Sequence, residues 1–329
     1  MSRLGIGLIG VGKHGVRYAT HITRDLAEEL RLVAIARRDT DAARRQAAEF
    51  GCRAYHDYRE LIAAADVDVL IVVVPPTAHP AIMEAAAAAH RPVLLEKPAA
   101  ANLVDGQRIL RAVRAAAIPV MVAHTVRYAS VVPVLLRARE AIGPLHALRL
   151  SQRFEPSRLG WIDDPAIAGG GMTLHTGVHV FDLARLLTGM EAERVSCEMA
   201  RVGTVHTEDN FAAVIRFGGG GGGVVLADIA GSRATASRCG AIEIAGERGQ
   251  LVADHVFNTA AIVRGTVSTV LAVPPPASTV LEVLRDFTRA IRSGTPMPIP
   301  LEEGLRAVAI ADACYEAAAS GRAAAVTPV

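Results

Sequence analysis

The stretch LGIGLIGVGKHG, residues 4–15, decides the fold of the first part of the chain. A short apolar run typical of a strand is followed by Gly10, Gly12 and Gly15 in the spacing GxGxxG, and then by a helical segment. Gly10 would allow a tight turn, Gly12 would let a pyrophosphate approach the backbone, and Gly15 would let the helix pack on the strand. Free N–H groups at the start of the helix would bind the phosphates. Because the motif lies between a strand and a helix, it predicts a dinucleotide site rather than a glycine turn without a ligand.

The segments that follow predict a doubly wound parallel sheet. Apolar, β-branched runs alternate with alanine-rich helical segments as far as about residue 123. Continuous apolar strands separated by helices are typical of a parallel sheet that is covered on both faces. We therefore expect an α/β fold whose residues 1–122 form a Rossmann domain. The runs are LRLVAIA (30–36), VDVLIVVV (67–74), RPVLLE (91–96) and IPVMVAH (118–124).

Residues 123–329 have a different pattern and predict a second, α+β domain with an open, mainly antiparallel sheet. Apolar and polar residues alternate along its strands, and glycine-rich turns separate them. Six consecutive glycines, Gly218–Gly223, predict a hairpin loop. A PPPAS linker near residue 275 precedes two helices, which we expect at about 279–292 and 302–320. The expected strands include HALRLSQRF (146–154), AAVIRF (212–217), GVVLADIAG (223–231) and AIEIAG (241–246).

Composition narrows the class of partner to a small molecule. The chain has 329 residues, a net charge of +2 and no block of lysine and arginine, which argues against nucleic acid or a membrane surface as a partner. No apolar stretch approaches the length of a membrane span. The cysteines are far apart and form no CxxC pair, so we expect reduced thiols and a cytoplasmic protein. They are Cys52, Cys197, Cys239 and Cys314.

The end of the second strand predicts which dinucleotide binds. An acidic residue is expected about 20 positions past the glycines when the ribose 2′-hydroxyl of NAD is bound. Here the strand is followed by Arg37, Arg38 and Asp39. Arginine pairs with a 2′-phosphate, whereas a carboxylate would repel it, so we expect NADP(H), with Arg37 as the first contact and Arg38 as the second. In the alternative, both arginines are solvated and Asp39 binds the ribose.

Glu96, Lys97 and Pro98 follow the strand RPVLLE. In an open α/β sheet the ligand lies beyond the carboxyl ends of the strands, so Lys97 is expected at the cofactor crevice. A lysine there can stabilise a developing alkoxide or accept a hydroxyl proton during hydride removal. Pro98 could hold a fixed, even cis, peptide that orients the side chain.

The sequence GGGMTLHTGVHVFDLARLL, residues 169–187, raises a separate question. His175, His179 and Asp182 stand at i, i+4 and i+7, along one face of an α-helix. A metal, a proton relay and a buried face are all compatible with this pattern. HxxxH is a zinc spacing, but the glutamate of HExxH and a third ligand are missing, so we expect no metal. His175 is either a site residue or a buried, hydrogen-bonded histidine.

Four motifs in this order resemble the Gfo/Idh/MocA oxidoreductases, which include glucose-fructose oxidoreductase and inositol dehydrogenase. They are GLIGVGKHG (7–15), PPTAH (75–79), EKP (96–98) and GGGxxxxxGxHxxD (169–182). The resemblance implies a Rossmann domain, a C-terminal α/β domain with an open sheet, and oxidation or reduction of a sugar-like carbinol. Relatives commonly associate through the exposed face of the C-terminal sheet, which implies a homodimer or homotetramer.

The resemblance also assigns residue roles. Lys97 and His179 match acid–base or substrate-binding residues of the family, and His175 stands where many members have an aspartate. Without that anion we expect Lys97 to lose its proton more easily. Among relatives there are also glycosidases that use nicotinamide transiently and catalytically silent dinucleotide-binding regulators, and both remain alternatives. Expected cofactor contacts are Gly10, Gly12, Lys13, His14, Gly15, Arg37, Arg38, Pro75, Thr77, His79, Glu96 and Lys97.

Residues near the start of the second domain are candidate substrate contacts. One group follows the strand that leads into that domain, and the other precedes the glycine run. Arginine, tryptophan and aspartate suit a polyol or a carboxylated sugar, although each is equally suited to a domain interface. With the two histidines, the candidates are His124, Arg127, Tyr128, Arg153, Trp161, Asp163, His175 and His179.

Overall fold

The structure, a computed structural model, describes residues 2–219 and 223–329 of the chain. These residues form two units, each with its own sheet. The first unit contains residues up to Ala100, Val104–His124 and Val280–Gly304; the second contains Ala101–Leu103, Thr125–Thr279 and Leu305–Val329. The sequence predicts a contiguous division at 122/123, whereas the chain returns to the first unit after residue 279.

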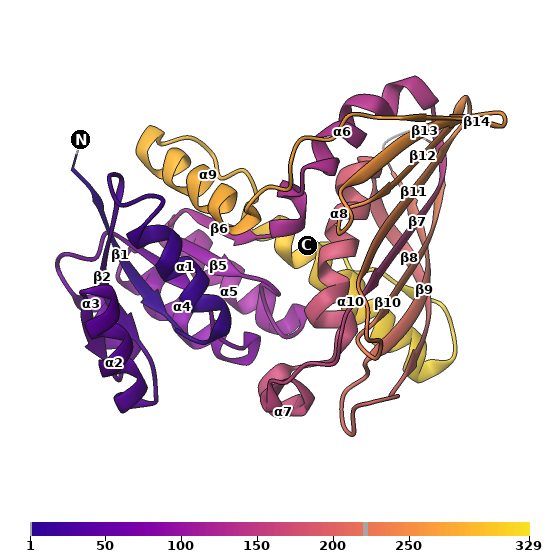
Figure 1. The fold of residues 1–329 in the computed structure, drawn as a ribbon. Helices are drawn as coiled ribbons and strands as arrows, with labels where there is room; N and C mark the ends of the chain where they lie inside the picture. Colours follow the sequence, from indigo (N-terminus) through magenta and orange to yellow (C-terminus); the bar gives the residue numbers. More distant parts are fainter. Residues whose placement is uncertain (1, 220–222) are drawn as a thin grey trace. The chain divides into compact units, whose positions relative to one another are not determined.

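The first unit contains a six-stranded parallel sheet in the order β3-β2-β1-β4-β5-β6 (Figure 1). This is the strand order of a Rossmann fold, so the expected fold class is confirmed. Every residue of β4 and β5 is buried, because helices cover both faces of the sheet. The strands are β1 (Leu4–Ile9), β2 (Leu30–Ala36), β3 (Arg53–Tyr55), β4 (Val69–Val72), β5 (Val93–Glu96) and β6 (Val120–Ala123).

Six helices accompany these strands. One of them, α9, comes late in the sequence and carries the apolar stripe Val280, Val283, Leu284 and Phe287, all buried. After it, the Ile299 carbonyl accepts a hydrogen bond from the Val122 N–H at 2.8 Å, which attaches the returning chain to β6. The helices are α1 (Lys13–Thr23), α2 (Thr40–Phe50), α3 (Tyr58–Ala63), α4 (His79–Ala88), α5 (Leu103–Ala116) and α9 (Thr279–Ser293).

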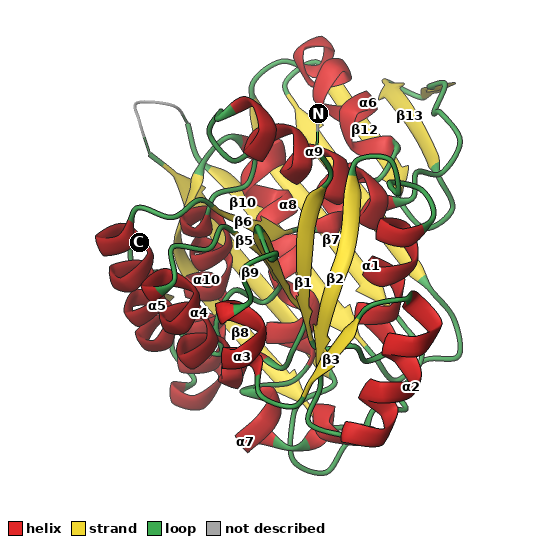
Figure 2. Ribbon diagram, turned by 90° about the vertical axis from the view of Figure 1, so that its left-hand side faces the viewer, coloured by secondary structure: helices red, strands yellow, loops and turns green. Residues whose placement is uncertain are grey.

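The second unit contains a nine-stranded sheet in the order β14-β13-β12-β11-β7-β10-β9-β8-β15 (Figure 2). Among the described residues of this unit, only β7 and β10 pair in parallel, so the expected mainly antiparallel sheet is confirmed. The strands are β7 (Leu145–Arg153), β8 (Glu191–Ala200), β9 (Asn210–Gly218), β10 (Val225–Ser232), β11 (Cys239–Gly246), β12 (Gly249–Asp254), β13 (Thr259–Arg264), β14 (Val267–Val270) and β15 (Ala324–Ala325).

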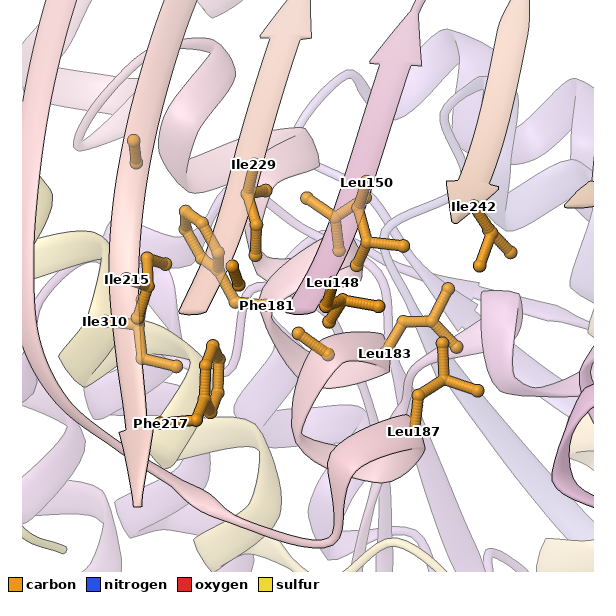
Figure 3. Packing of buried hydrophobic residues seen from close by; sticks show 14 of the residues in the cluster. Leu148, Leu150, Phe181, Leu183, Leu187, Ile215, Phe217, Ile229, Ile242 and Ile310 are labelled. Atoms are coloured by element: carbon orange, nitrogen blue, oxygen red, sulfur yellow. The ribbon is translucent and has the colours of Figure 1, made fainter. Parts of the chain in front are cut away.

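Helices cover one face of this sheet. Leu148 and Leu150 of β7 face Leu183 and Leu187 of a helix in a buried apolar cluster (Figure 3). On the other face, Val214 and Leu226 are 55% and 53% exposed, because successive strand residues point to opposite sides. The helices are α6 (Val131–Ala138), α7 (Pro165–Ala168), α8 (Val178–Thr188) and α10 (Leu301–Ser320).

Two local predictions can be compared with the structure. β9 and β10 pair antiparallel, as the expected hairpin requires, although residues 220–222 of its Gly218–Gly223 loop lie outside the described residues. The two last helices are confirmed as α9 and α10. Within the described residues, no helix is both long enough and apolar enough to cross a membrane.

Candidate active site

The glycine turn of the first unit has the shape that a pyrophosphate requires. Gly10 has φ +92°, and a Cβ there would collide with the Val73 carbonyl. A Cβ on Gly15 would collide with the Gly10 carbonyl, so this glycine lets α1 approach the turn. A Cβ on Gly12 would meet nothing within 4 Å, and no side chain caps the first N–H groups of α1. The residues therefore fit a dinucleotide: Gly12 leaves the approach open, and the N-terminus of α1 offers free donors.

Arg37 and Asp39 play different parts beyond β2. Arg37 donates to the Val11 carbonyl and to Gln46 Oε1, both at 3.1 Å, which holds its guanidinium beside the glycine turn. Asp39 accepts the Ala42 N–H at 3.0 Å as the N-cap of α2. Arg38 is exposed. The first charge after β2 at this site is therefore positive. Asp39 uses Oδ1 as the cap of α2, and its Oδ2 lies 3.8 Å from Arg37 Nη2.

The EKP segment begins where β5 ends. Glu96 is its last residue, and the Lys97–Pro98 peptide is cis. The Tyr18 hydroxyl of α1 donates to Glu96 Oε2 at 2.6 Å, and both side chains are buried. His14, also on α1, lies in the fields of Glu96 and Lys97: partial burial lowers its pKa, Glu96 opposes this shift and Lys97 adds to it. Position and charge thus group His14 with the EKP segment, while its expected contact with the cofactor stays a prediction.

His79 has a role that the sequence does not predict. Its side chain has no exposed surface; its Nδ1 lies 3.2 Å from the Ala99 carbonyl and its Nε2 lies 3.1 Å from the Val74 carbonyl. In the same PPTAH stretch, Thr77 is exposed and Pro75 is half-buried. The expected direct contact of His79 with the cofactor is therefore replaced by support of two loops, because a fully enclosed ring has no surface for a ligand.

Two glycines of the run in the second unit are packed closely against protein, and Gly169 is exposed. Gly169 has φ +74° and ends α7. A Cβ on Gly170 would collide with the Tyr315 hydroxyl, and one on Gly171 would collide with Glu208. Gly170 therefore makes room for Tyr315, and Gly171 makes room for Glu208. Both side chains accept hydrogen bonds from the Gly171 N–H, Glu208 at 3.2 Å and Tyr315 at 3.0 Å.

The histidine segment begins as a π-helical turn, Thr173–Gly177, and continues as α8. The regular α-helical spacing expected for His175 and His179 is therefore replaced by a wider turn at its start, a feature that is frequent at functional sites. His175 is 6% exposed, its Nε2 lies 2.9 Å from the Ala168 carbonyl, and Trp161 meets its ring edge-on at 5.5 Å. His179 is 9% exposed on the first turn of α8.

Asp182 pairs with Arg127 inside the second unit. The guanidinium donates through Nε and Nη2 to the two carboxylate oxygens at 2.7 and 2.5 Å, and Asp182 is 1% exposed. This bidentate pair joins α8 to the segment Thr125–Tyr128. Arg127 therefore has a positioning role, and a substrate contact by Arg127 or Tyr128 stays a prediction.

Asp163 lines a cavity of the second unit but uses its carboxylate on the main chain, and Arg153 lies on the open face of the sheet. Asp163 accepts main-chain N–H groups of Val205, His206 and Thr207, each at 2.9 Å, and these bonds hold its pKa well below the usual range. Arg153 is the exposed end of β7 and alternates with buried Gln152, so it points to the open face of the sheet, away from α8. For His124, the chain places the residue directly after β6, and a substrate contact stays a prediction.

Several residues that line the candidate site were missed by sequence reasoning. Arg233 donates to the Thr176 hydroxyl at 2.9 Å, beside the π-helical turn. It lines a cavity of about 230 Å³ in the second unit together with Arg158, Glu208 and Asp209. Burial lowers the pKa of Arg233, and the two carboxylates oppose this shift. In the sequence these are isolated charges, so only the tertiary fold reveals the group.

Metal-binding candidates are scarce. Across residues 2–219 and 223–329, the structure gathers no group of three or more His, Cys, Asp or Glu side chains suited to a metal ion. The lack of a metal stays a prediction. The four cysteines are free thiols.

Comparison with known proteins identifies the family of both units. Residues 4–124 match the model of an oxidoreductase family with an NAD-binding Rossmann fold, and residues 138–327 match the C-terminal alpha/beta domain of the same family. Myo-inositol 2-dehydrogenase of Thermotoga maritima is 28% identical over 92% of each chain. D-apiose dehydrogenase of Paraburkholderia graminis is 24% identical, with 96% of this chain and 88% of that one covered. A structure of levoglucosan dehydrogenase with NADH and L-sorbose has a TM-score of 0.90 at 24% identity, over the full length of both chains.

Fold and sequence together define the class: a nicotinamide-dinucleotide-binding oxidoreductase that acts on CH–OH groups. Within that class, the chain belongs to the Gfo/Idh/MocA family, both of whose domains it contains. The family expected from the four motifs is thereby confirmed.

Proposed function

We propose that the protein is an NADP(H)-dependent oxidoreductase that transfers a hydride between nicotinamide and a carbinol or carbonyl carbon of a sugar, cyclitol or related hydroxy compound. The observation that carries this proposal is the first unit, where an open Gly12 turn and Lys97 lie at the carboxyl ends of β1 and β5 of one parallel sheet. The named activities of the relatives, on myo-inositol and D-apiose, support a polyhydroxylated substrate.

The proton chemistry falls to Lys97 and His179. When bound, the nicotinamide accepts or supplies the hydride. In the oxidative direction, the substrate hydroxyl loses its proton to the neutral amine of Lys97 or to the imidazole of His179 as the carbon loses hydride. In the reductive direction, the same group returns the proton to the carbonyl oxygen. His175 stands where many members of the family have an aspartate, so an imidazole replaces that carboxylate in the segment.

Arg37 supports a preference for NADP(H). Its guanidinium is held at the glycine turn and carries the first charge after β2, whereas Asp39 caps α2. Arg37→Gln should weaken NADPH binding about 10- to 100-fold, the value of one or two charge-assisted hydrogen bonds, and leave NADH binding nearly unchanged. Arg45→Gln, at an exposed position on α2, is the matched control. Fluorescence titration measures both cofactors, and tighter binding of NADH by the native protein would contradict the preference.

The substrate class is tested by following absorbance at 340 nm with a panel of sugars, cyclitols and sugar acids. Turnover with NADP⁺ that depends on one such compound is the expected outcome. Product formation without a net change at 340 nm would indicate the glycosidase alternative. Dinucleotide binding without turnover of any compound, together with a stable partner protein, would indicate the regulator.

The assembly is also a proposal. The open face of the large sheet carries exposed apolar residues, including Val214, Leu226 and Val252, which suit association as a homodimer or homotetramer in the cytoplasm. Light scattering of the native protein and of Val214→Glu tests this: the substitution should lower the measured mass. If Val214→Glu has the same measured mass as the native protein, the interface lies elsewhere.

A further inference from the structure

We infer that Tyr18 and His79 are positioning residues for Lys97. Each of them restrains the backbone on one side of this lysine. The inference rests on the proposed function insofar as Lys97 acts on substrate. All the residues involved belong to the first unit.

The N-terminal side of Lys97 is fixed by Tyr18. Its hydroxyl donates to Glu96 Oε2 at 2.6 Å, one residue before the lysine. Tyr18 has no exposed surface and Glu96 is 7% exposed, so water does not compete for this bond. Burial and the Glu96 charge both raise the pKa of Tyr18, so the hydroxyl keeps its proton and stays a donor. The Glu96 carboxylate is thereby tied to α1, which begins at the glycine turn.

The C-terminal side of Lys97 is packed against His79. Burial lowers the pKa of His79, so the neutral ring donates a single hydrogen bond, to one of two neighbouring carbonyls. The ring lies between the Ala99 carbonyl, two residues after the lysine, and the Val74 carbonyl, in the loop that follows β4. Val73, next to Val74, packs its carbonyl against Gly10. Tyr18 therefore links the EKP segment to α1, which follows the dinucleotide turn, and His79 links it to the loop after β4, which packs on that turn. Lys97 and the dinucleotide turn are thereby held in a fixed relation.

This arrangement gives a role to two fully buried polar side chains, Tyr18 just after the glycine motif and His79 in PPTAH. A misplacement of a catalytic group by about 1 Å can cost on the order of 100-fold in rate. Tyr18 and His79 act on Lys97 by restraining the backbone on either side of it. Their removal should thus affect the chemical step more than dinucleotide binding, which depends on Gly12 and α1.

The kinetic test compares Tyr18→Phe with Tyr58→Phe, a control on α3 whose ring lies beside Arg59. Tyr18→Phe keeps the buried ring and removes only the donor to Glu96. We expect kcat to fall about 5- to 100-fold, the effect of leaving one buried acceptor without its donor, while the dissociation constant of NADPH changes less than twofold. Tyr58→Phe should match the native protein. Equal losses in kcat and dinucleotide affinity, or native kcat in Tyr18→Phe, would overturn the inference.

A second test needs no turnover. The chain has only two lysines, Lys13 and Lys97. Reductive methylation with ¹³C-formaldehyde therefore gives two lysine signals and one from the N-terminal amine, which Lys13→Arg and Lys97→Arg assign. In Tyr18→Phe, and in His79→Leu where it folds, the Lys97 signal should shift or broaden while the Lys13 signal stays in place. An unchanged Lys97 signal, or equal movement of both signals, would contradict the positioning role.

The two tests separate this inference from the proposed function. If Lys97→Ala keeps full turnover, the proposed chemistry is contradicted. A selective shift of the Lys97 signal in Tyr18→Phe would still support the positioning role of Tyr18. If Lys97→Ala is inactive and Tyr18→Phe leaves both kcat and the Lys97 signal at native values, the positioning role is contradicted. The proposed proton transfer by Lys97 is then retained.

Discussion

At the scale of single residues, Lys97 and His179 carry the proposed proton transfer. Each lies at an element end: Lys97 directly follows β5, and His179 is on the first turn of α8. Element ends place a side chain at an edge of the fold while the strand or helix keeps its backbone fixed. His79 and Arg127, by contrast, lie in or beside recognisable motifs but use their polar groups on the protein itself.

Lys97→Ala should abolish turnover and leave dinucleotide binding intact, because it removes the proton acceptor but not the phosphate-binding turn. His179→Ala should reduce kcat by about 100-fold or more, in the range of general acid–base catalysis. Steady-state kinetics and cofactor titration measure the two effects. Native rates in either variant would refute the assignment.

Breaking the Arg127–Asp182 pair should destabilise the second unit. Arg127→Gln leaves a nearly fully buried carboxylate without its counterion, which costs about 3–5 kcal/mol of unfolding free energy. The double variant Arg127→Gln/Asp182→Asn should recover part of this loss, because no buried charge remains unpaired. Urea unfolding measures the stability. A raised KM in both variants, with native stability in the single one, would instead indicate that Arg127 contacts substrate.

At the scale of elements, short main-chain anchors fix the loops around α8. Asp163 holds residues 205–207, and Glu208 accepts the Thr173 N–H at 2.9 Å, so a loop before β9 supports the π-helical turn. The sequence predicts a helix here from its apolar period and histidine spacing. The wider turn could not be predicted, because its partners Glu208 and Tyr315 come from segments far along the chain.

Asp163 makes the stability of this loop dependent on pH. Its folded pKa lies below that of an exposed aspartate, which is about 3.9, so its contribution is complete above that pH and is lost as the pH falls below it. Asp163→Asn should be less stable than the native protein at pH 7, and the difference should shrink below about pH 4. Thermal unfolding measures this. Asp228→Asn, whose carboxylate faces Arg149 at 3.4 Å, is the control, and an equal pH dependence in both variants would count against the anchor.

At the scale of the whole molecule, the first unit consists of segments that are separated in the sequence. Residues 280–304 return to it after the second sheet is complete. The sequence predicts α9 from its periodicity but assigns it to the second domain, since an amphipathic helix does not specify which apolar surface it will cover. Phe287, which is 2% exposed, is one of the residues that α9 buries.

Phe287→Ala should therefore destabilise the first unit although residue 287 follows the second sheet in sequence. A buried phenylalanine replaced by alanine costs about 3–5 kcal/mol. Hydrogen exchange followed by mass spectrometry should locate the lost protection in residues 1–124. Arg289→Ala, on the same helix with an exposed side chain, should change little. Lost protection confined to residues 125–279 would be inconsistent with this placement.

The sequence by itself determined the doubly wound parallel sheet, the mainly antiparallel second sheet, the family and the strand end after which Lys97 lies. These depend on local periods, glycine spacing and ordered motifs, which are properties of neighbouring residues. Only the tertiary structure decided that His79 supports a loop, that Asp163 anchors one, that the triple glycine accommodates Glu208 and Tyr315, and that α9 belongs to the first unit. In each case the partner lies far away in sequence, and the choice between binding a ligand and supporting the fold depends on which polar group the folded chain brings within hydrogen-bonding distance.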